Sequence, residues 1–558
     1  MRIPRDSVKM DNMTGNRTEK QQQPPDSDED QDFCQKPIFY QNLTFETELP
    51  SPSVPVDEIA SIPPPPNLTK LDFPYDWSPT HKAFITGVSC ISTLFSSFAA
   101  SCYSPGVTHM TAEWHVSQVA VLVGITTFTS GFAVGPMFLA PFSEINGRKP
   151  VFVATAILFA VCQLCCSVTR SFPGMLVARF FAGVGGSTFS TMVGGIVSDI
   201  YLARDRNTPM ALFSWAALFG TGLGPLVCGF IAEYTTWRWI FYVQIITGGM
   251  ISLAVILFFR ETRAPVVLRA RAERLNKWYE ELESKGYYGV NWAQQDVENK
   301  VPEGTIAPEK QVIRLRWKIA ADEERANLST MLRTSLLRPF QLLFTEPVVF
   351  FFALWAAFAW SVLYINLSVI PLVFESAYGF SLSKSDAIFT ASCTGSTLAL
   401  FISIYQEHLA STKWQKGKWN SVPEHRLYFS CLEGICLPIG LFLFGWSSHY
   451  QVHWVVPAIA LGIATLGIFS IYLAVFNYLT DTYHRYASSA LAAQSFCRNM
   501  LGGIFPLVST QMFDNLSFGP AASLLGGIAT ALALVPWVLV FFGPQIRAKS
   551  KLAKEIMD

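Results

Sequence analysis

Long apolar runs, each close to the length of a membrane-spanning helix, recur along this chain between residues 83 and 542. A helix needs roughly 20 mostly apolar residues to cross the hydrocarbon layer of a bilayer. Twelve segments meet or approach that length, six on each side of a hydrophilic stretch, 260–347. They are Ala83–Tyr103, Gln118–Ala140, Val151–Val168, Gly174–Val197, Met210–Ala232, Ile240–Phe259, Val348–Val373, Ala387–Ile404, Leu427–Trp446, Trp454–Leu479, Ala487–Val508 and Ala521–Phe542.

This six-plus-six pattern is typical of a transporter built from two repeated helix bundles. We therefore predict an all-α membrane protein with 12 transmembrane helices in two six-helix bundles, 83–259 and 348–542. The first and eleventh segments are polar enough that hydropathy alone could miss them. The Pro-, Gln- and Asp-rich stretch 1–75 is predicted to be a disordered tail. The central linker, 260–347, is expected to hold a surface helix near 267–285, and a short tail, 543–558, ends the chain.

Composition supports this class of protein and excludes others. The chain of 558 residues is 51% hydrophobic and only 15% charged, whereas soluble domains carry about 25% charged residues. The formal net charge is zero, so nothing indicates a nucleic-acid partner. Of the eleven cysteines, all except Cys34 lie in apolar stretches without metal-ligand spacing. We expect no metal and no cofactor.

Lys and Arg in the short loops predict the orientation, because they concentrate on the cytoplasmic side. The bias places both termini and the linker in the cytoplasm. We predict a multi-pass protein of the plasma membrane, with the vacuolar membrane as the alternative. Among the glycosylation sequons, this orientation leaves Asn515 in a short outer loop, where it is a weak candidate for modification.

The fifth segment combines Pro225 with the glycines Gly220, Gly224 and Gly229. Proline removes a helix hydrogen bond and bends the helix, and glycines at four-residue spacing let another helix approach closely. This combination suits a hinge or a seal in a protein that changes shape. An ordinary glycine-lined contact with an incidental bend is equally compatible with the residues.

Ionisable residues at membrane depth are costly and usually face a cavity or a partner. Arg179 in the fourth segment needs an acidic or carbonyl partner, unless it extends to the headgroups. Arg498 lies about halfway along the eleventh segment, where such an escape is harder. Glu433 in the ninth segment is either a protonatable carboxyl or a local partner of Arg426.

The loop between the second and third segments holds Glu144, Gly147, Arg148 and Lys149. Glu144 can accept hydrogen bonds from a helix N-terminus or from an arginine. These residues could therefore form a breakable latch, and plain anchoring by the two cations explains part of the pattern. We find no phosphate-binding loop, nucleophile motif or dinucleotide fingerprint, so we expect no enzyme, and energy would come from an ion gradient.

Aromatic residues crowd the seventh segment, and a polar Asn366 follows them. Phe358, Trp360, Tyr364 and Asn366 are tentative residues of a substrate cavity, and Glu433 is a tentative carboxyl group of the same cavity. Helix packing is the plainer explanation for such a stripe.

The sequence motifs of this chain, taken together and in order, resemble those of a known family. The chain is similar to the fungal twelve-span drug:proton antiporters of the major facilitator superfamily, from about Tyr75 to Ser550. The resemblance rests on Glu144–Lys149, Arg179–Gly185, Gly220–Gly229, Trp237–Phe241, Thr345–Pro347, Pro371–Glu375, Tyr378–Phe380, Asp481–Tyr483, Ser489–Ala493, Arg498–Asn499 and Phe505–Leu507. The chain departs from the family pattern at Glu144 (usually Asp), Ala140 (usually Gly), Ile145 (usually a base) and Cys228 (usually Gly).

The resemblance implies a proton-coupled efflux transporter that works by alternating access. Arg179 would couple protonation to binding, Gly220–Gly229 would be the antiporter motif, and the loop would latch the bundles near the eleventh helix. The cargo would be a small lipophilic or cationic molecule: a drug, another xenobiotic or a self-made metabolite. Its partners would be protons, the cargo and lipid, and the protein is expected to be a monomer. A nutrient or polyamine transporter of the same fold, or a membrane receptor or scaffold, are the alternatives.

Overall fold

The computed structural model describes residues 38–52, 63–202, 205–285, 287, 289–292, 311–323, 328–415, 424, 427–483 and 486–549. The chain divides into two compact units. The first holds the residues up to Leu68 together with Ala270–Ala320, and the second holds Thr69–Arg269 together with Ala321–Asp558. All twelve predicted spans therefore belong to the second unit.

The described residues of the first unit form two short sheets and part of a helix. Strand β1 (Phe39–Asn42) pairs in parallel with β4 (Leu315–Lys318), and β2 (Val290–Trp292) pairs antiparallel with β3 (Gln311–Ile313). Helix α9 (Ala264–Ser284) begins in the second unit, ends in the first and confirms the predicted surface helix. The prediction of a disordered tail is wrong for residues 39–42, because β1 finds its partner strand far along the chain, in the linker.

A buried charge cluster supports the first unit. Glu283 of α9 accepts hydrogen bonds from Arg314, at 3.0 Å, and from Arg316 of β4, at 2.8 Å. Burial alone would raise the pKa of Glu283, but the hydrogen bonds and charges of the two arginines outweigh it and lower that pKa below its usual range. The cluster therefore joins the helix to the sheet.

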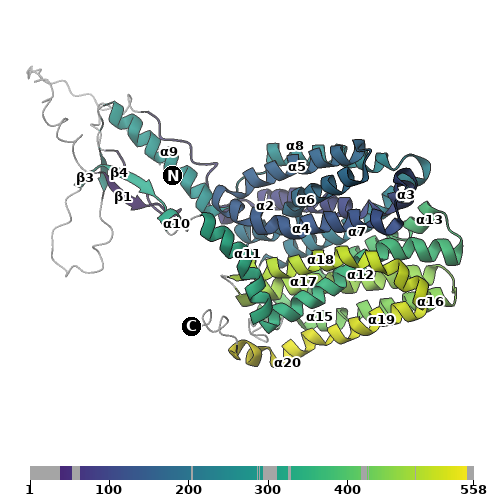
Figure 1. Cartoon of the computed structure of the whole chain (residues 1–558). Coiled ribbons are helices and arrows are strands. Elements are labelled where there is room, and N and C mark those ends of the chain that lie inside the picture. The colour runs from purple at the N-terminus through teal and green to yellow at the C-terminus, as the bar shows by residue number, and fades with distance from the viewer. Residues whose placement is uncertain are drawn as a thin grey trace, which may run out of the picture. The chain divides into compact units, whose positions relative to one another are not determined.

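The second unit begins with a bundle of long helices, which lie side by side in the blue part of Figure 1. Three of them begin at a serine that accepts a hydrogen bond from the first turn: Ser78, Ser117 and Ser171. Such caps satisfy N–H groups that have no partner within the helix. The elements of the bundle are η2 (Pro74–Asp76), α2 (Pro79–Ser101), η3 (Ser104–Gly106), α3 (Val107–Trp114), α4 (Gln118–Asn146), α5 (Arg148–Val168), α6 (Phe172–Ile200), α7 (Asn207–Tyr234) and α8 (Arg238–Phe258).

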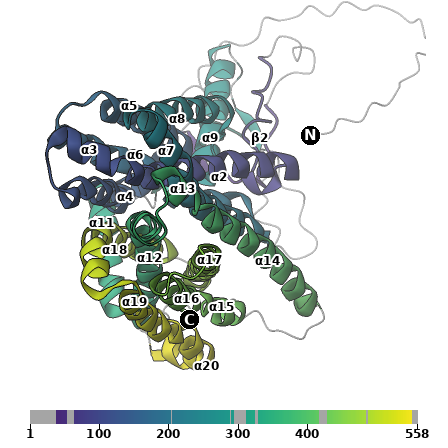
Figure 2. The same cartoon turned by 90° about the vertical axis from the view of Figure 1, so that its right-hand side faces the viewer.

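A second bundle follows the linker, and Figure 2 shows the two as separate groups of helices, blue and green-to-yellow. Helix α4 of the first bundle packs against α18 of the second, and α7 packs against α13 and α14. The elements of the second bundle and its approach are α10 (Ala320–Glu323), α11 (Leu328–Thr345), α12 (Pro347–Tyr378), α13 (Leu382–Ala387), α14 (Thr390–Gln415), α15 (Tyr428–Glu433), α16 (Cys436–His449), α17 (Val455–Tyr483), α18 (Ala487–Leu516), α19 (Phe518–Leu532) and α20 (Leu534–Lys549).

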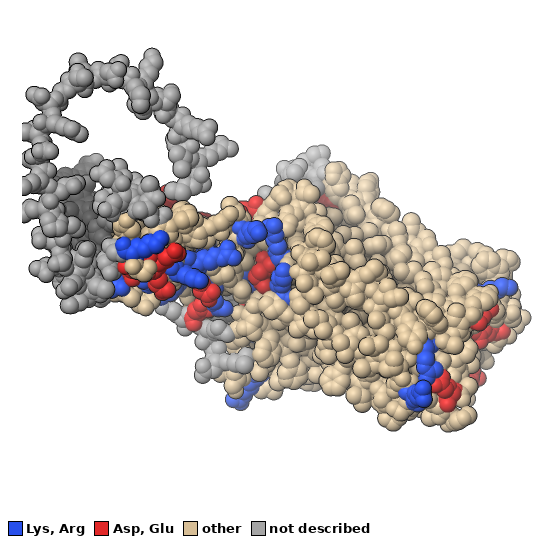
Figure 3. All heavy atoms as spheres, turned by 90° about the horizontal axis from the view of Figure 1, so that it is seen from above, with Lys and Arg blue, Asp and Glu red and all other residues tan. Residues whose placement is uncertain are grey.

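Eleven helical stretches of the described chain are long and apolar enough to cross a membrane. The remaining predicted span, the eleventh along the chain, is α18, a helix of 30 residues that is too polar to qualify by composition. Its polar residues Gln494, Arg498 and Asn499 are all buried. They face protein rather than lipid, which is why hydropathy misses this helix. On the face shown in Figure 3, charged side chains gather near the two ends of the helical body, and the surface between them is uncharged.

Candidate functional site

The predicted glycines of α7 serve two different contacts. A Cβ atom at Gly220 would clash with the carbonyl group of Leu94, and one at Gly224 would lie 2.9 Å from the carbonyl oxygen of Phe98. These two glycines therefore let α7 lie directly against α2, within the first bundle. Helix α7 continues across the buried Pro225 to its end at Tyr234.

On its other face, α7 meets the second bundle. A Cβ atom at Gly222 would lie 3.0 Å from the Sγ atom of Cys393 in α14, and one at Gly229 would lie 2.5 Å from the Cβ atom of Asp386 in α13. Gly229 thus belongs to the contact between the bundles, unlike Gly220 and Gly224. The side chain of Cys228 is fully buried here.

Asp386 is a buried carboxyl group at this contact that the sequence analysis missed. Its residue is 1% exposed, and neither carboxylate oxygen has a hydrogen-bond partner among the described residues. Beside it, Glu233 of α7 accepts the backbone N–H of Ser383 in α13, with an N···O distance of 2.6 Å. Glu375 of α12 is the third carboxyl group at this end. Asp386 was not predicted as a site residue because it lies just before the predicted eighth span, which begins at Ala387.

Arg179 lies fully buried inside the first bundle. Its guanidinium group donates to the carbonyl oxygens of Ala99 in α2, at 3.0 Å, and Gly124 in α4, at 3.2 Å. It also lies over the rings of Tyr103 and Phe128, 4.7 and 4.5 Å from their centres. Arg179 therefore ties α6 to two other helices through carbonyl groups, and it forms no ion pair with a described residue.

The loop between α4 and α5 is built around Gly147 and Arg148. Gly147 has φ +99°, a conformation that glycine adopts readily and other residues rarely do. Glu261, after α8, accepts the backbone N–H groups of Arg148, at 2.8 Å, and Lys149, at 3.0 Å. The Nε atom of Arg148 lies 3.1 Å from a carboxylate oxygen of Asp199 in α6.

These contacts differ from the predicted latch near the eleventh helix. The partners of Arg148 and of the Lys149 backbone, Asp199 and Glu261, lie in the first bundle or directly after it. Glu144, predicted as the acidic part of the latch, makes no hydrogen bond or ion pair with the described residues. Asp199 and Glu261 supply the carboxylates instead. Sequence reasoning missed Glu261 because it assigned residues from 260 onward to the linker.

Arg498 lies at the centre of an aromatic cluster in the second bundle. Its guanidinium carbon is 4.3 Å from the ring centre of Trp360 in α12 and 4.7 Å from that of Tyr472 in α17. Of the four predicted cavity residues on α12, Trp360 and Tyr364 lie on this side, next to Gly502 of α18. Phe358 and Asn366 are also buried, but they project from other faces of α12, because they are two or six residues from Trp360 and Tyr364 and a helix has 3.6 residues per turn.

The remaining predicted residues lie elsewhere. Glu433, in the last turn of α15, accepts a hydrogen bond from Gln406 of α14, while the alternative partner, Arg426, lies outside the described residues. Asn515 is exposed in the last turn of α18 rather than in a loop.

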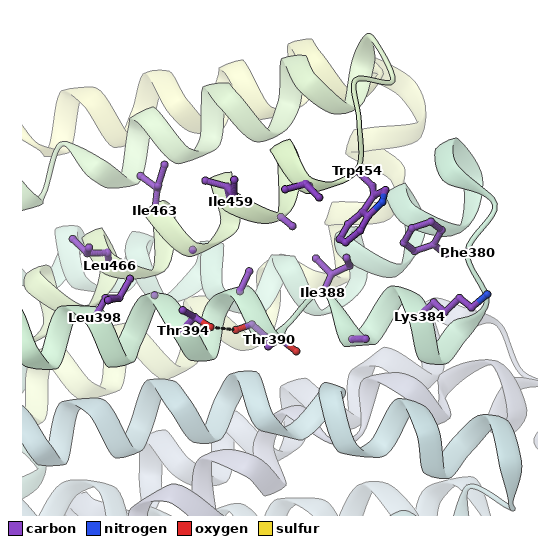
Figure 4. A pocket seen from close by; sticks show the side chains of 16 residues that line it. Phe380, Lys384, Ile388, Thr390, Thr394, Leu398, Trp454, Ile459, Ile463 and Leu466 are labelled. Carbon is purple, nitrogen blue, oxygen red and sulfur yellow. Dashed lines mark hydrogen bonds between the residues drawn. The ribbon is translucent and has the colours of Figure 1, made fainter.

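A groove of about 680 Å³ runs between α14 and α17, and its lining is almost entirely apolar. Figure 4 shows Leu398 and Ile459 on its two walls, with Lys384 and Trp454 toward one end. None of the five predicted cavity residues, Glu433 included, lines this groove. Leu398 and Ile459 are each more than half exposed, so the groove opens on the outer surface of the helical body.

Comparison with known proteins agrees with this architecture. A model of the Major Facilitator Superfamily matches residues 89–506. The chain is 31% identical to multidrug transporter TPO1_1 of Candida glabrata over 481 residues, which are 86% of this chain and 78% of that protein. It is 30% identical to the MFS-type efflux pump MFS2 of Trichophyton rubrum over 482 residues, 86% and 76% of the two chains. The solved structure of the xylose transporter XylE from E. coli, in a partially occluded inward-open conformation, is similar in fold. Its TM-score is 0.54 at 16% identity, over 82% of this chain and 99% of that one.

Proposed function

We propose, from the premise that this chain belongs to the Major Facilitator Superfamily and to its fungal multidrug transporters, that it exports small lipophilic molecules in exchange for protons. The protein is a multi-pass membrane transporter and not an enzyme. One relative, MFS2 of Trichophyton rubrum, is named an efflux pump, which supports the direction of transport. We place the protein in the plasma membrane, as a monomer with cytoplasmic termini.

Alternating access requires contacts between the bundles that can break in turn at either end. At the linker end, Asn477 of α17 donates to Asn207 of α7, at 2.8 Å. At the opposite end, Ser104 donates to the carbonyl oxygen of Leu367 in α12, at 2.6 Å. Each such hydrogen bond contributes only about 1 kcal/mol net. These two hydrogen bonds therefore add little to the cost of opening either end.

The buried carboxyl group of Asp386 is the observation that carries the proton-coupling proposal. An ionised carboxylate without partners is costly away from water, whereas a proton-bound carboxyl group is tolerated much better. Proton uptake by Asp386 would therefore favour closure of α13 onto Gly229, and ionisation would favour opening. With cytoplasmic termini, this end faces the outside. Arg179 would couple the change at this end to the first bundle through its carbonyl contacts.

Flux in reconstituted vesicles tests this proposal. Vesicles with an imposed pH gradient would be challenged with neutral, cationic and anionic lipophilic dyes. We expect at least one dye to accumulate only while the gradient lasts, and Asp386→Asn to lose that dependence. The matched control is Asp514→Asn, since Asp514 is an exposed carboxylate of α18. Wild-type uptake that is the same with and without a gradient, or Asp386→Asn transport with full gradient dependence, would contradict the proposal.

A further inference from the structure

Arg498 is a buried cation without a counter-ion among the residues that the structure describes. Its residue is 1% exposed, and its Nε and Nη1 atoms have no hydrogen-bond partner among the described residues. The two aromatic rings beside it offer cation–π attraction. Rings cannot accept the directed hydrogen bonds of a guanidinium group in the way a carboxylate does. The side chain therefore retains binding capacity that the protein itself does not use.

The surrounding helices carry no carboxylate at this depth. Helices α12, α17 and α18 each contain a single acidic residue, close to a helix end: Glu375, Asp481 and Asp514. The nearest in sequence to one of the two rings that contact Arg498 is Asp481, nine residues beyond Tyr472, which is about 13 Å along a helix. The acidic residues of the facing helices α4 and α7, Glu144 and Glu233, also lie near helix ends.

Other unpartnered polar groups share this region. The Nε1 atom of Trp360, the hydroxyl group of Tyr472 and both amide atoms of Gln494 are buried without hydrogen-bond partners among the described residues. Gln494 lies one turn before Arg498, on the same face of α18. Together with Arg498, these groups offer an excess of hydrogen-bond donors. Such a set suits a ligand that brings acceptors and a negative charge.

The cluster also offers flat apolar surfaces at the junction of the bundles. Tyr472 stacks on Trp360 with ring centres 5.1 Å apart, and it meets Phe213 of α7 at 6.1 Å. Phe476 lies 4.8 Å from Tyr472 and 6.0 Å from Phe213. The rings thus come from both bundles, and any separation of the bundles here would expose them next to Arg498.

We infer that Arg498 binds the acidic group of the cargo, and that the cargo is a planar aromatic carboxylate rather than a cation. This inference rests on the proposed function and names its substrate class. The carboxylate would accept from Arg498, with Gln494 and Tyr472 as further donors, and the aromatic body would lie among the rings. A cationic cargo would instead meet an unpaired positive charge.

Binding of three probes with the same ring system tests the charge preference. The full chain in phosphatidylcholine nanodiscs would be titrated with 2-naphthoate, methyl 2-naphthoate and 2-naphthylmethylammonium, by equilibrium dialysis. We expect wild type to bind the carboxylate at least about tenfold more tightly than the ester or the cation, because charge-assisted hydrogen bonds are the strong ones. Equal affinities, or a preference for the cation, would overturn the inference.

Two variants separate a binding role from a structural one. Arg498→Gln should weaken 2-naphthoate binding by about 30-fold or more and leave the ester within about threefold, since the ester has no charge to pair. Gln494→Glu keeps Arg498 but gives it a carboxylate one turn away, so it should show the same selective loss. Arg338→Gln, which removes an arginine lying over the ring of Tyr486 outside the cluster, is the matched control.

The outcomes distinguish this inference from the proposed function. Parallel loss of all three probes in both variants would mean that Arg498 only supports the fold, and unchanged 2-naphthoate binding would remove its role. If phosphatidylglycerol in the nanodiscs competes with 2-naphthoate in wild type, the site binds lipid headgroups and the cargo assignment fails. Selective binding of 2-naphthoate without gradient-driven flux of any dye in the vesicle assay would overturn the transport proposal alone. Gradient-driven flux of neutral dyes without any carboxylate preference would overturn only the cargo class.

Discussion

Replacing Gly147 with alanine should destabilise the first bundle more than any ordinary surface substitution. The backbone there has φ +99° and ψ 160°, a region in which a side chain costs about 1–3 kcal/mol. The new Cβ atom would also lie on the Glu261 carboxylate, 2.8 Å from its Cδ atom. That carboxylate caps α5 with two charge-assisted hydrogen bonds, each contributing about 1.5–3 kcal/mol. Loss of one bond plus the strain gives about 2.5–6 kcal/mol.

Thermal unfolding in detergent, followed by the loss of monodisperse protein, measures this effect. Gly87→Ala is the matched control, because a Cβ atom there meets nothing within 4 Å and alanine is favoured over glycine inside a helix by about 0.5–1 kcal/mol. We expect a clear drop in the unfolding temperature for Gly147→Ala and none for Gly87→Ala. In the Glu261→Ala background the effect of Gly147→Ala should shrink toward the strain alone. If Gly147→Ala melts like wild type, the capping role of Glu261 is refuted.

Three further substitutions test other contacts. Gly224→Val should impair transport because the side chain would force α7 away from α2, whereas Gly249→Val, at an exposed glycine of α8 with open space around it, should not; equal flux through both would show that the α2–α7 contact is not functionally tight. Arg179→Ala should keep surface expression but lose gradient-driven export, and wild-type export by this variant would remove its coupling role. Glu283→Gln should lower the free energy of unfolding of the first unit by about 1–3 kcal/mol, reduced from the buried-pair range because the group is partly exposed. The pKa of Glu283 is lowered in the folded protein. The stabilisation from its ionised carboxylate is therefore complete above the unfolded pKa of about 4.3 and is lost as pH falls through the folded pKa. Hydrogen-exchange protection at Leu315–Lys318, corrected for the intrinsic exchange rate at each pH, should fall in acid, and protection that stays constant would contradict this role of Glu283.

The helix pattern could be predicted from the sequence because the membrane imposes it locally. A run of about 20 apolar residues identifies a span wherever the helix faces lipid. Helix α18 shows the limit of that rule, since Gln494, Arg498 and Asn499 are buried against protein. Position and spacing identify this helix, while its hydropathy does not. Strand β1 was not predicted for a related reason. Its partner β4 is distant in sequence, and residues 39–42 alone do not indicate that the two strands pair.

The candidate site divides along the same line. Gly220, Gly224 and Arg179 stand out locally, because a glycine repeat and a charge in an apolar segment are visible in the sequence. Asp386 and Glu261 do not stand out, since each lies just outside a predicted span. Their roles depend on contacts with distant parts of the chain: Asp386 contacts Gly229, and Glu261 caps the start of α5. The face that each residue presents depends on helix rotation, which separated Trp360 and Tyr364 from Phe358 and Asn366.

Proton movement coupled to cargo movement is the central claim, and it can be measured directly. Vesicles with an acidic lumen containing the pH dye pyranine would receive a dye that wild type accumulates, with Asp386→Asn vesicles alongside. We predict that addition of the dye makes the lumen of wild-type vesicles more alkaline, in proportion to uptake, and that Asp386→Asn vesicles show no such change. Uptake by wild type that proceeds without any change in lumenal pH would contradict proton exchange.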